Sequence, residues 1–112
     1  MIIGEWKAAT IANAGTSSAA VDLGREYETL LIYLPTLTSG TIKVQGAEKL
    51  ASTYADIYTT ETSTGAPVAV ISGATVGGFF WVAPIGGFKY IKIVSGASQG
   101  AERLIRVCGV RS

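Results

Sequence analysis

The stretch Thr29-Leu30-Leu31-Ile32-Tyr33-Leu34-Pro35 decides the fold class of this 112-residue chain. A short apolar run bounded by turn residues is more typical of a β-strand covered on both faces than of so short a helix. Pro35 ends the run because proline lacks the N–H that a strand ladder needs. Side chains alternate along a strand. One face would therefore carry Leu30, Ile32 and Leu34, and the other Thr29, Leu31 and Tyr33.

Further segments show the alternation or β-branched and aromatic content that is typical of strands. They are Trp6–Ala12, Ser18–Leu23 (ended by Gly24), Thr41–Gln45 (Ile42 and Val44 inward), Tyr54–Thr60 (Ile57 inward), Val68–Ile71, Phe79–Val82 (ended by Pro84), Phe88–Val94 (Ile91 and Ile93 inward) and Glu102–Val110 (Ile105 and Val107 inward). Gly-rich or polar stretches separate them, and residues 61–67 and 72–78 are expected to be loops.

This pattern predicts an all-β fold, an antiparallel β-sandwich or jelly roll of about eight short strands. Residues 1–112 are enough for a single domain with its own core. Residues 47–52 could make one helical turn, but a turn of that length has no stability of its own.

The composition limits the classes of partner. Only 15% of the residues are charged while 48% are hydrophobic, so we expect part of the surface to be covered by other proteins. A net charge of +1 provides no field that would attract nucleic acid or an anionic membrane. The N-terminus lacks the basic and apolar regions of a signal peptide, which favours assembly in the cytoplasm.

No arrangement of residues predicts catalysis or a cofactor. The chain has no histidine and a single cysteine, Cys108, which excludes an internal disulfide and a Cys/His metal site. Without a neighbouring base, Cys108 is expected to be an inert, packed thiol. The glycine pairs 77–78 and 86–87 lack the Gly-Lys-Ser/Thr sequence of a phosphate loop. We therefore expect a protein that is not an enzyme.

Two sets of charged residues could be either ordinary surface charges or parts of a binding site. Asp22, Glu26 and Glu28 could offer oxygen ligands to Ca²⁺, but they follow no calcium-loop spacing and fit solvated surface charge. Three arginines near the C-terminus fit a solvated strand face or ion pairs to a partner better than a nucleic-acid site; they are Arg103, Arg106 and Arg111.

Aromatic residues supply the candidate protein interface. Within Phe79–Val82 one alternating pair must face the core, and the other must lie outside, where a protein partner would cover it. Tyr54 and Tyr58 flank Asp56 on one predicted strand face. They could pack across the sheet, contact a protein, or stack on a sugar while the acid binds a hydroxyl. The predicted interface residues are Tyr54, Tyr58, Phe79 and Trp81.

Several segments taken together resemble the small virion proteins of tailed bacteriophages. They are Thr-Ser-Ser-Ala-Ala-Val-Asp-Leu-Gly (16–24), the strand ending in Leu34-Pro35, Thr-Ile-Lys-Val-Gln-Gly (41–46), Tyr-Ala-Asp-Ile-Tyr (54–58) and Phe-Lys-Tyr-Ile-Lys-Ile-Val-Ser-Gly-Ala-Ser-Gln-Gly-Ala-Glu-Arg (88–103). The chain resembles in particular the short jelly-roll cement, or staple, proteins that decorate icosahedral phage heads.

The resemblance implies a structural protein on the capsid exterior of the virion, bound to the phage major capsid protein and stabilising the shell. The poorly charged surface adds the expectation of a homodimer, since closed two-fold pairs are the commonest oligomers. Two other functions stay open at this point. One is a tail or fibre accessory protein of a phage, and the other is a carbohydrate-binding β-sandwich module.

Overall fold

The computed structural model describes residues 2–38, 40–60, 67–72 and 76–111, and in them the protein is all-β. The strands are β1 (Ile2–Ile3), β2 (Lys7–Ala8), β3 (Val21–Thr36), β4 (Ile42–Ala47), β5 (Ala55–Asp56), β6 (Tyr58–Thr60), β7 (Pro67–Ala69), β8 (Gly77–Ser95) and β9 (Arg106–Arg111). All their pairings are antiparallel, which confirms the predicted fold class. The described residues contain no helix that is long and apolar enough to cross a membrane.

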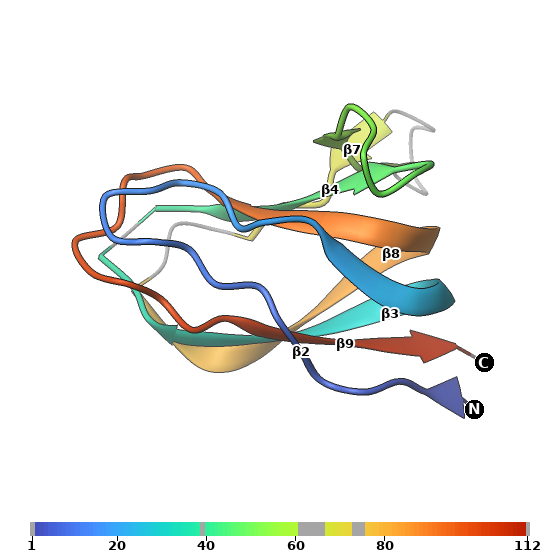
Figure 1. Ribbon diagram of the computed structural model, residues 1–112, viewed down its shortest axis with the longest axis horizontal. Coiled ribbons are helices and arrows are strands. Elements are labelled where there is room, and N and C mark those ends of the chain that lie inside the picture. Colours follow the sequence, from blue (N-terminus) through green and yellow to red (C-terminus); the bar gives the residue numbers. More distant parts are fainter. Residues whose placement is uncertain (1, 39, 61–66, 73–75, 112) are drawn as a thin grey trace.

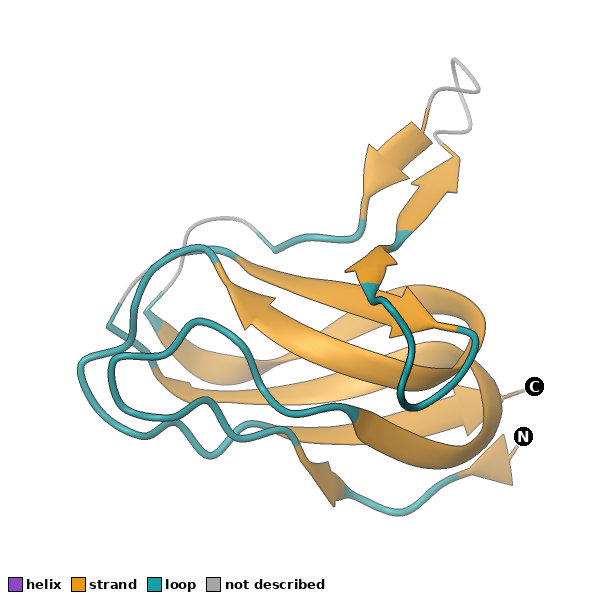
Figure 2. Cartoon of the chain, turned by 45° about the horizontal axis from the view of Figure 1, so that its top comes forward, coloured by secondary structure: helices purple, strands orange, loops and turns teal. Residues whose placement is uncertain are grey.

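One sheet contains seven of the strands. Its order is β1-β9-β3-β8-β4-β5, with β2 also paired to β9 (Figure 1). The strands β6 and β7 pair separately and project away from the body of the molecule (Figure 2). The first and last described strands are thus neighbours, because both β1 and β2 pair with β9.

The two long strands β3 and β8 bend, so that the single sheet closes over itself as two layers (Figure 1). In one layer, residues 29–36 of β3 lie between β9 and residues 77–84 of β8. In the other, residues 90–95 of β8 lie beside β4. The register between β3 and β8 shifts twice between Asp22 and Thr29. Strands that pass from one layer to another through bulges are a known way to build the corners of a sandwich.

These bends correct two predicted strand ends, at Gly24 and at Pro84. Gly24 has a φ of 89° and its N–H donates to the Asp22 carboxylate (2.8 Å), so it forms a bulge inside β3. Pro84 lies within β8, and the chain turns further along, at Gly86 and Gly87, whose φ values are also positive. The structure therefore has two long strands where the sequence predicted four short ones.

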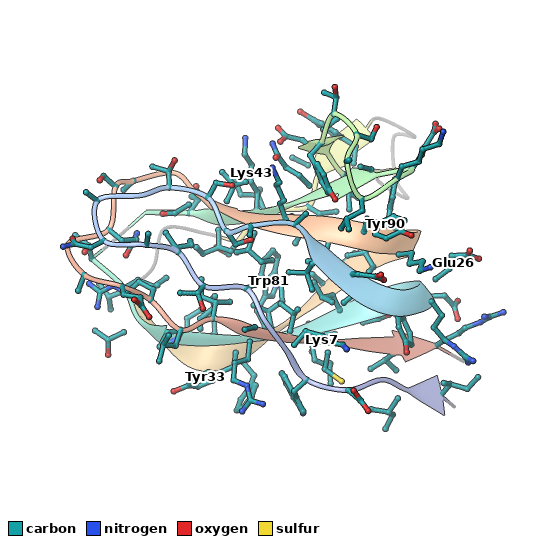
Figure 3. All side chains as sticks on the ribbon, in the orientation of Figure 1. Lys7, Glu26, Tyr33, Lys43, Trp81 and Tyr90 are labelled. Carbon is teal, nitrogen blue, oxygen red and sulfur yellow. The ribbon has the colours of Figure 1, made fainter. Side chains whose placement is uncertain are left out.

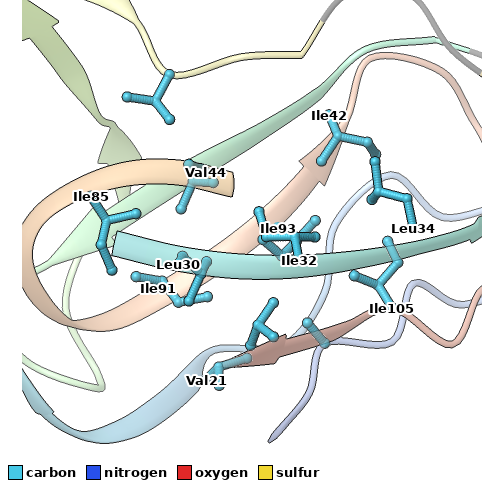
Figure 4. Packing of buried hydrophobic residues seen from close by; sticks show 14 of the residues in the cluster. Val21, Leu30, Ile32, Leu34, Ile42, Val44, Ile85, Ile91, Ile93 and Ile105 are labelled. Atoms are coloured by element: carbon cyan, nitrogen blue, oxygen red, sulfur yellow. The ribbon is translucent and has the colours of Figure 1, made fainter. Parts of the chain in front are cut away.

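The core lies between the two layers (Figure 4). The predicted inward residues are fully buried in it: Leu30, Ile32, Leu34, Ile42, Val44, Ile91, Ile93, Ile105 and Val107. Burying an aliphatic side chain of this size contributes about 1.5–3 kcal/mol. The alternation in the sequence thus identified these inward positions correctly.

The second face of the stretch 29–35 differs from the prediction. Thr29 and Leu31 are only half-buried, and Tyr33 keeps 37% of its surface exposed. No described element covers this side of the sheet fully, so the central strand is buried on one face only. Ala47 ends β4, and residues 48–52 make turns and bends and no helix. Of the loops predicted at 61–67 and 72–78, residues 61–66 and 73–75 lie outside the described residues, whereas Pro67 begins β7 and Gly77 and Gly78 begin β8.

Candidate protein interface

A row of three side chains crosses the outer face of the layer formed by β9, β3 and β8. Tyr33 is the register partner of Arg106 on one side and of Phe80 on the other. Directly paired residues of antiparallel strands point to the same face of the sheet. Since Leu34 and Ile32 point into the core, these three side chains point outward, and Figure 3 shows Tyr33 on the side away from the core.

Trp6 completes this group from a distant part of the sequence. It lies between β1 and β2, which both pair with β9, and this pairing holds the indole against the layer. The ring of Phe80 lies 6.1 Å from that of Trp6 (61° between planes) and 5.2 Å from that of Tyr33. The Arg106 guanidinium lies 6.0 Å from the Trp6 ring centroid, in cation–π range. We call Trp6, Tyr33, Phe80 and Arg106 the aromatic patch.

The aromatic patch surrounds a shallow hollow of ≈ 360 Å³. Trp6 is 40% exposed and Phe80 66% exposed, and two further exposed aliphatics, Val82 and Leu104, lie nearby in sequence on β8 and just before β9. Large exposed aromatic groups in a cluster are unusual unless a partner covers them. Trp, Tyr and Arg are also the residue types that most often dominate binding at protein interfaces. The hollow therefore fits an apolar or aromatic side chain of a protein partner.

The structure resolves which half of the Phe79–Val82 alternation faces outward. Phe80 and Val82 are the more exposed pair, at 66% and 61%. Trp81 packs partly against the core, and Figure 3 shows it between the two layers. Phe79 is 42% exposed. Of the residues predicted for the interface, Phe79 and Trp81 thus belong to the inward phase, and an interface role for them stays a prediction.

Tyr54 and Tyr58 do not belong to the aromatic patch. Tyr54 directly precedes β5 of the seven-stranded sheet, and Tyr58 begins β6 of the two-stranded sheet. The Tyr54 hydroxyl donates to the Leu50 carbonyl (3.0 Å), and the Lys92 ammonium lies 4.7 Å from the centroid of its ring. Partial burial, together with nearby negative groups, raises the pKa of Tyr54. Tyr58 is 57% exposed on β6, and no contact joins the two rings in the described part of the chain.

Asp56, between the two tyrosines in sequence, is held by β4. It accepts hydrogen bonds from the Gln45 amide (2.9 Å) and from the Lys43 ammonium (3.1 Å). These two bonds lower the pKa of the Asp56 carboxyl, because both stabilise its ionised form. The carboxylate is thus already paired with two side chains of β4, and a different lysine, Lys92, covers the Tyr54 ring.

The acidic group and the thiol have structural partners. Asp22, Glu26 and Glu28 are exposed, and the Asp22 carboxylate accepts the Gly24 N–H of the bulge. The described residues contain no group of three or more His, Cys, Asp or Glu side chains that could hold a metal ion. Cys108 is fully buried and its thiol donates to the Gly4 carbonyl (3.3 Å). Burial raises its pKa, which keeps the thiol protonated.

Sequence reasoning missed the aromatic patch because three of its members were assigned other roles. The sequence places Trp6 on a predicted strand, Tyr33 under a second layer, and Arg106 on a solvated strand face or in an ion pair to a partner. One signal was present in the sequence. The outward face of 29–35 is uncharged, and a second aromatic pair was required outside on Phe79–Val82.

Comparison with known proteins gives a likeness of fold. No protein-family model matches the sequence, and no curated protein matches it. Among solved structures, the chain is similar to the crystal structure of the SPBc2 prophage-derived protein YomS. The TM-score is 0.56 at 15% sequence identity, over 97% of this chain and 95% of that one. The two proteins share a fold across nearly their whole length.

Proposed function

We propose that this protein is a structural component of a phage particle, a cement or staple protein that binds the outside of the capsid and stabilises the shell. The observation that carries the proposal is the aromatic patch, an exposed apolar surface on a poorly charged domain. Its structural neighbour comes from a prophage, and the sequence resembles small virion decoration proteins, which both support a role in a phage particle.

Mass action explains how so small a protein can strengthen a shell. A molecule that binds the closed shell but not its separated subunits stabilises the closed form by RT ln(1 + [L]/Kd) at each site. Many equivalent sites on one head multiply this effect. Each contact can therefore be modest, and the ≈ 360 Å³ hollow with its four residues is of the right kind for one anchoring side chain of the major capsid protein.

The chemistry of the patch predicts how binding responds to conditions. Three of its four residues are aromatic, and Arg106 is the only charged one. The whole chain has a net charge of +1, so long-range electrostatic attraction to a capsid is weak. Salt screens exposed charges but leaves apolar contacts in place. Binding to heads should therefore fall only slightly between low and high salt.

The test uses purified protein and heads stripped of accessory proteins. Binding is measured by co-sedimentation, and shell disruption is followed during heating and in the presence of a chelator. A higher disruption temperature at saturation supports the cement role. Saturated binding with no gain in shell stability rejects it. Binding to isolated tails but not to heads would instead identify a tail or fibre accessory protein.

The matched variants are Phe80→Ala, which removes the most exposed ring of the aromatic patch, and Leu50→Ala, which removes an exposed apolar side chain elsewhere. The proposal expects the first to reduce both binding and shell stabilisation, and the second to leave them unchanged. Equal behaviour of the two variants would show that the aromatic patch is not the contact surface.

A further inference from the structure

The first half of β8 is an edge strand. Residues 79–83 pair with Leu30–Leu34 of β3 on one side, and β4 pairs only with residues 90–95 of β8. Within the described ranges, no backbone partner lies along the other side of residues 79–83. Alternate N–H and C=O groups of this segment therefore point away from β3 toward open space. Figure 1 shows this half of β8 at the border of its layer.

Residues 79–83 lack the devices that usually keep an exposed edge from pairing. Such devices are charged side chains, prolines, inward-pointing charges, bulges, or very short strands. No charged residue occurs from Gly77 to Gly87, the only proline there is Pro84, just beyond the segment, and Phe79, Phe80 and Val82 are 42%, 66% and 61% exposed. An apolar and uncharged edge of this kind is a template for a further strand.

We propose that residues 79–83 pair antiparallel with the same residues of a second copy across a two-fold axis. The segment can pair with an identical segment, because a two-fold axis brings the same surface of both copies together and makes the two strands antiparallel. The ends of the segment fix the register. Gly78 has a φ of 86°, outside the extended region, and Pro84 has no N–H to donate. Only a register centred on Trp81 uses all the residues between them and neither of those two.

The side chains agree with this register. It places Phe80 directly opposite Val82 of the second copy, an aromatic group against a β-branched one, twice across the axis. Faces match as well, since Phe80 and Val82 both point outward in each copy, and Ala83, which is fully buried, marks the end of the surface that the second copy can reach.

The pairing joins the β9–β3–β8 layers of the two copies into one continuous layer. A two-fold axis between antiparallel neighbours is perpendicular to their sheet, so the outer faces of both copies lie on the same side. The two aromatic patches then form one apolar surface around the axis, with both Phe80 rings near its centre. This dimer follows from the edge alone and does not depend on the proposed capsid role.

The first experiment measures the mass of the purified protein by sedimentation at increasing concentration. The proposal expects twice the chain mass of 11.6 kDa. Two double variants test the register at exposed positions. Phe80→Lys with Val82→Lys places like charges directly opposite each other and should give monomers. Phe80→Glu with Val82→Lys removes the same apolar groups but places opposite charges across the axis, and should retain the dimer.

The third variant, Leu50→Ala, removes an exposed apolar side chain that lies outside both the edge and the aromatic patch, and should leave the dimer intact. A wild-type protein that remains monomeric up to about millimolar concentration, far above the usual Kd range of specific interfaces, would overturn the proposal. A dimer that survives in the Lys/Lys variant would also overturn it.

Hydrogen exchange provides a readout that does not depend on substitutions. In the dimer, the amides of residues 79–83 that point away from β3 should be protected from hydrogen exchange. This protection should disappear when the protein is diluted to the monomer. A dimer that leaves these amides as exchangeable as in the monomer would show that the copies meet elsewhere, even if both charge variants were monomeric.

Discussion

The ring of Phe80 lies 6.1 Å from the indole of Trp6, with their planes at 61°, although 73 residues separate them in the chain. This edge-to-face pair exists because β2 pairs with β9, and β9 with β3, which brings the N-terminal segment across the layer to β8. The contact orders two exposed rings before any partner binds. A preordered surface loses less conformational entropy on binding.

Removing the indole should therefore weaken binding more than its own contacts with a partner suggest. We expect Trp6→Ala to reduce affinity for stripped heads by roughly tenfold or more, the usual effect of truncating an aromatic hot-spot residue. The free energy of unfolding should also fall, because more than half of the indole is buried against the layer, so affinity is compared under conditions in which both proteins are fully folded. Co-sedimentation with heads measures the affinity, and urea unfolding provides the control. Unchanged affinity would remove Trp6 from the interface.

The Asp56 carboxylate should make stability depend on pH in the acid range. Its hydrogen bonds to Gln45 and Lys43 lower its pKa in the folded state. The stabilisation is therefore complete above the unfolded value of ~3.9 and is lost as pH falls through the lower folded value. Asp56→Asn should cost less than about 1 kcal/mol at pH 7, because the pair is partly exposed. The difference from wild type should close below about pH 4.

Cys108 should have the opposite effect, in the alkaline range. Burial raises its pKa, so the unfolded thiol ionises first as pH rises. Above about pH 8.5, the usual thiol value, ionisation favours the unfolded state, and stability should decline until the folded thiol also ionises. Cys108→Ser should fold, keep its binding to heads, and lack this decline. Chemical unfolding between neutral and alkaline pH tests this, and an identical decline in the variant would assign it to other groups.

Gly109 should tolerate no side chain. An added Cβ would collide with the ring of Tyr27, which is buried in the core cluster. Overpacking of this kind typically costs about 1–3 kcal/mol, so Gly109→Ala should lower the unfolding free energy by that amount. Gly100→Ala is the matched control, because its Cβ would meet only the Thr38 hydroxyl. Equal stability of the two variants would show that Tyr27 can move aside.

The sequence predicted the inner face of the sandwich because one phase of each alternation carries the large aliphatics, as Ile91 and Ile93 show. The continuity of the strands was less visible. Gly24 and Pro84 look like strand ends, yet a bulge and a corner use the same residue types as a turn. The phase of Phe79–Val82 could not be decided locally, since both of its faces are apolar.

The aromatic patch was harder still to predict. Its four residues come from the segment before β2, from β3, from β8 and from β9. They meet only because of strand order, which no local pattern specifies. The homodimer and the capsid partner remain predictions for the experiments above.

The position of β9 in the sheet also has a consequence for how the protein is made. Residues 29–33 of β3 pair on one side with β9, and the residues of β9 are synthesised long after those of β3. At usual rates of synthesis, about 5–20 residues per second, the interval between Thr36 and Arg106 lasts on the order of 4–15 s. Throughout that time the central strand of the nascent chain has an open edge. A chaperone that shields this strand on the ribosome would raise the yield of folded protein.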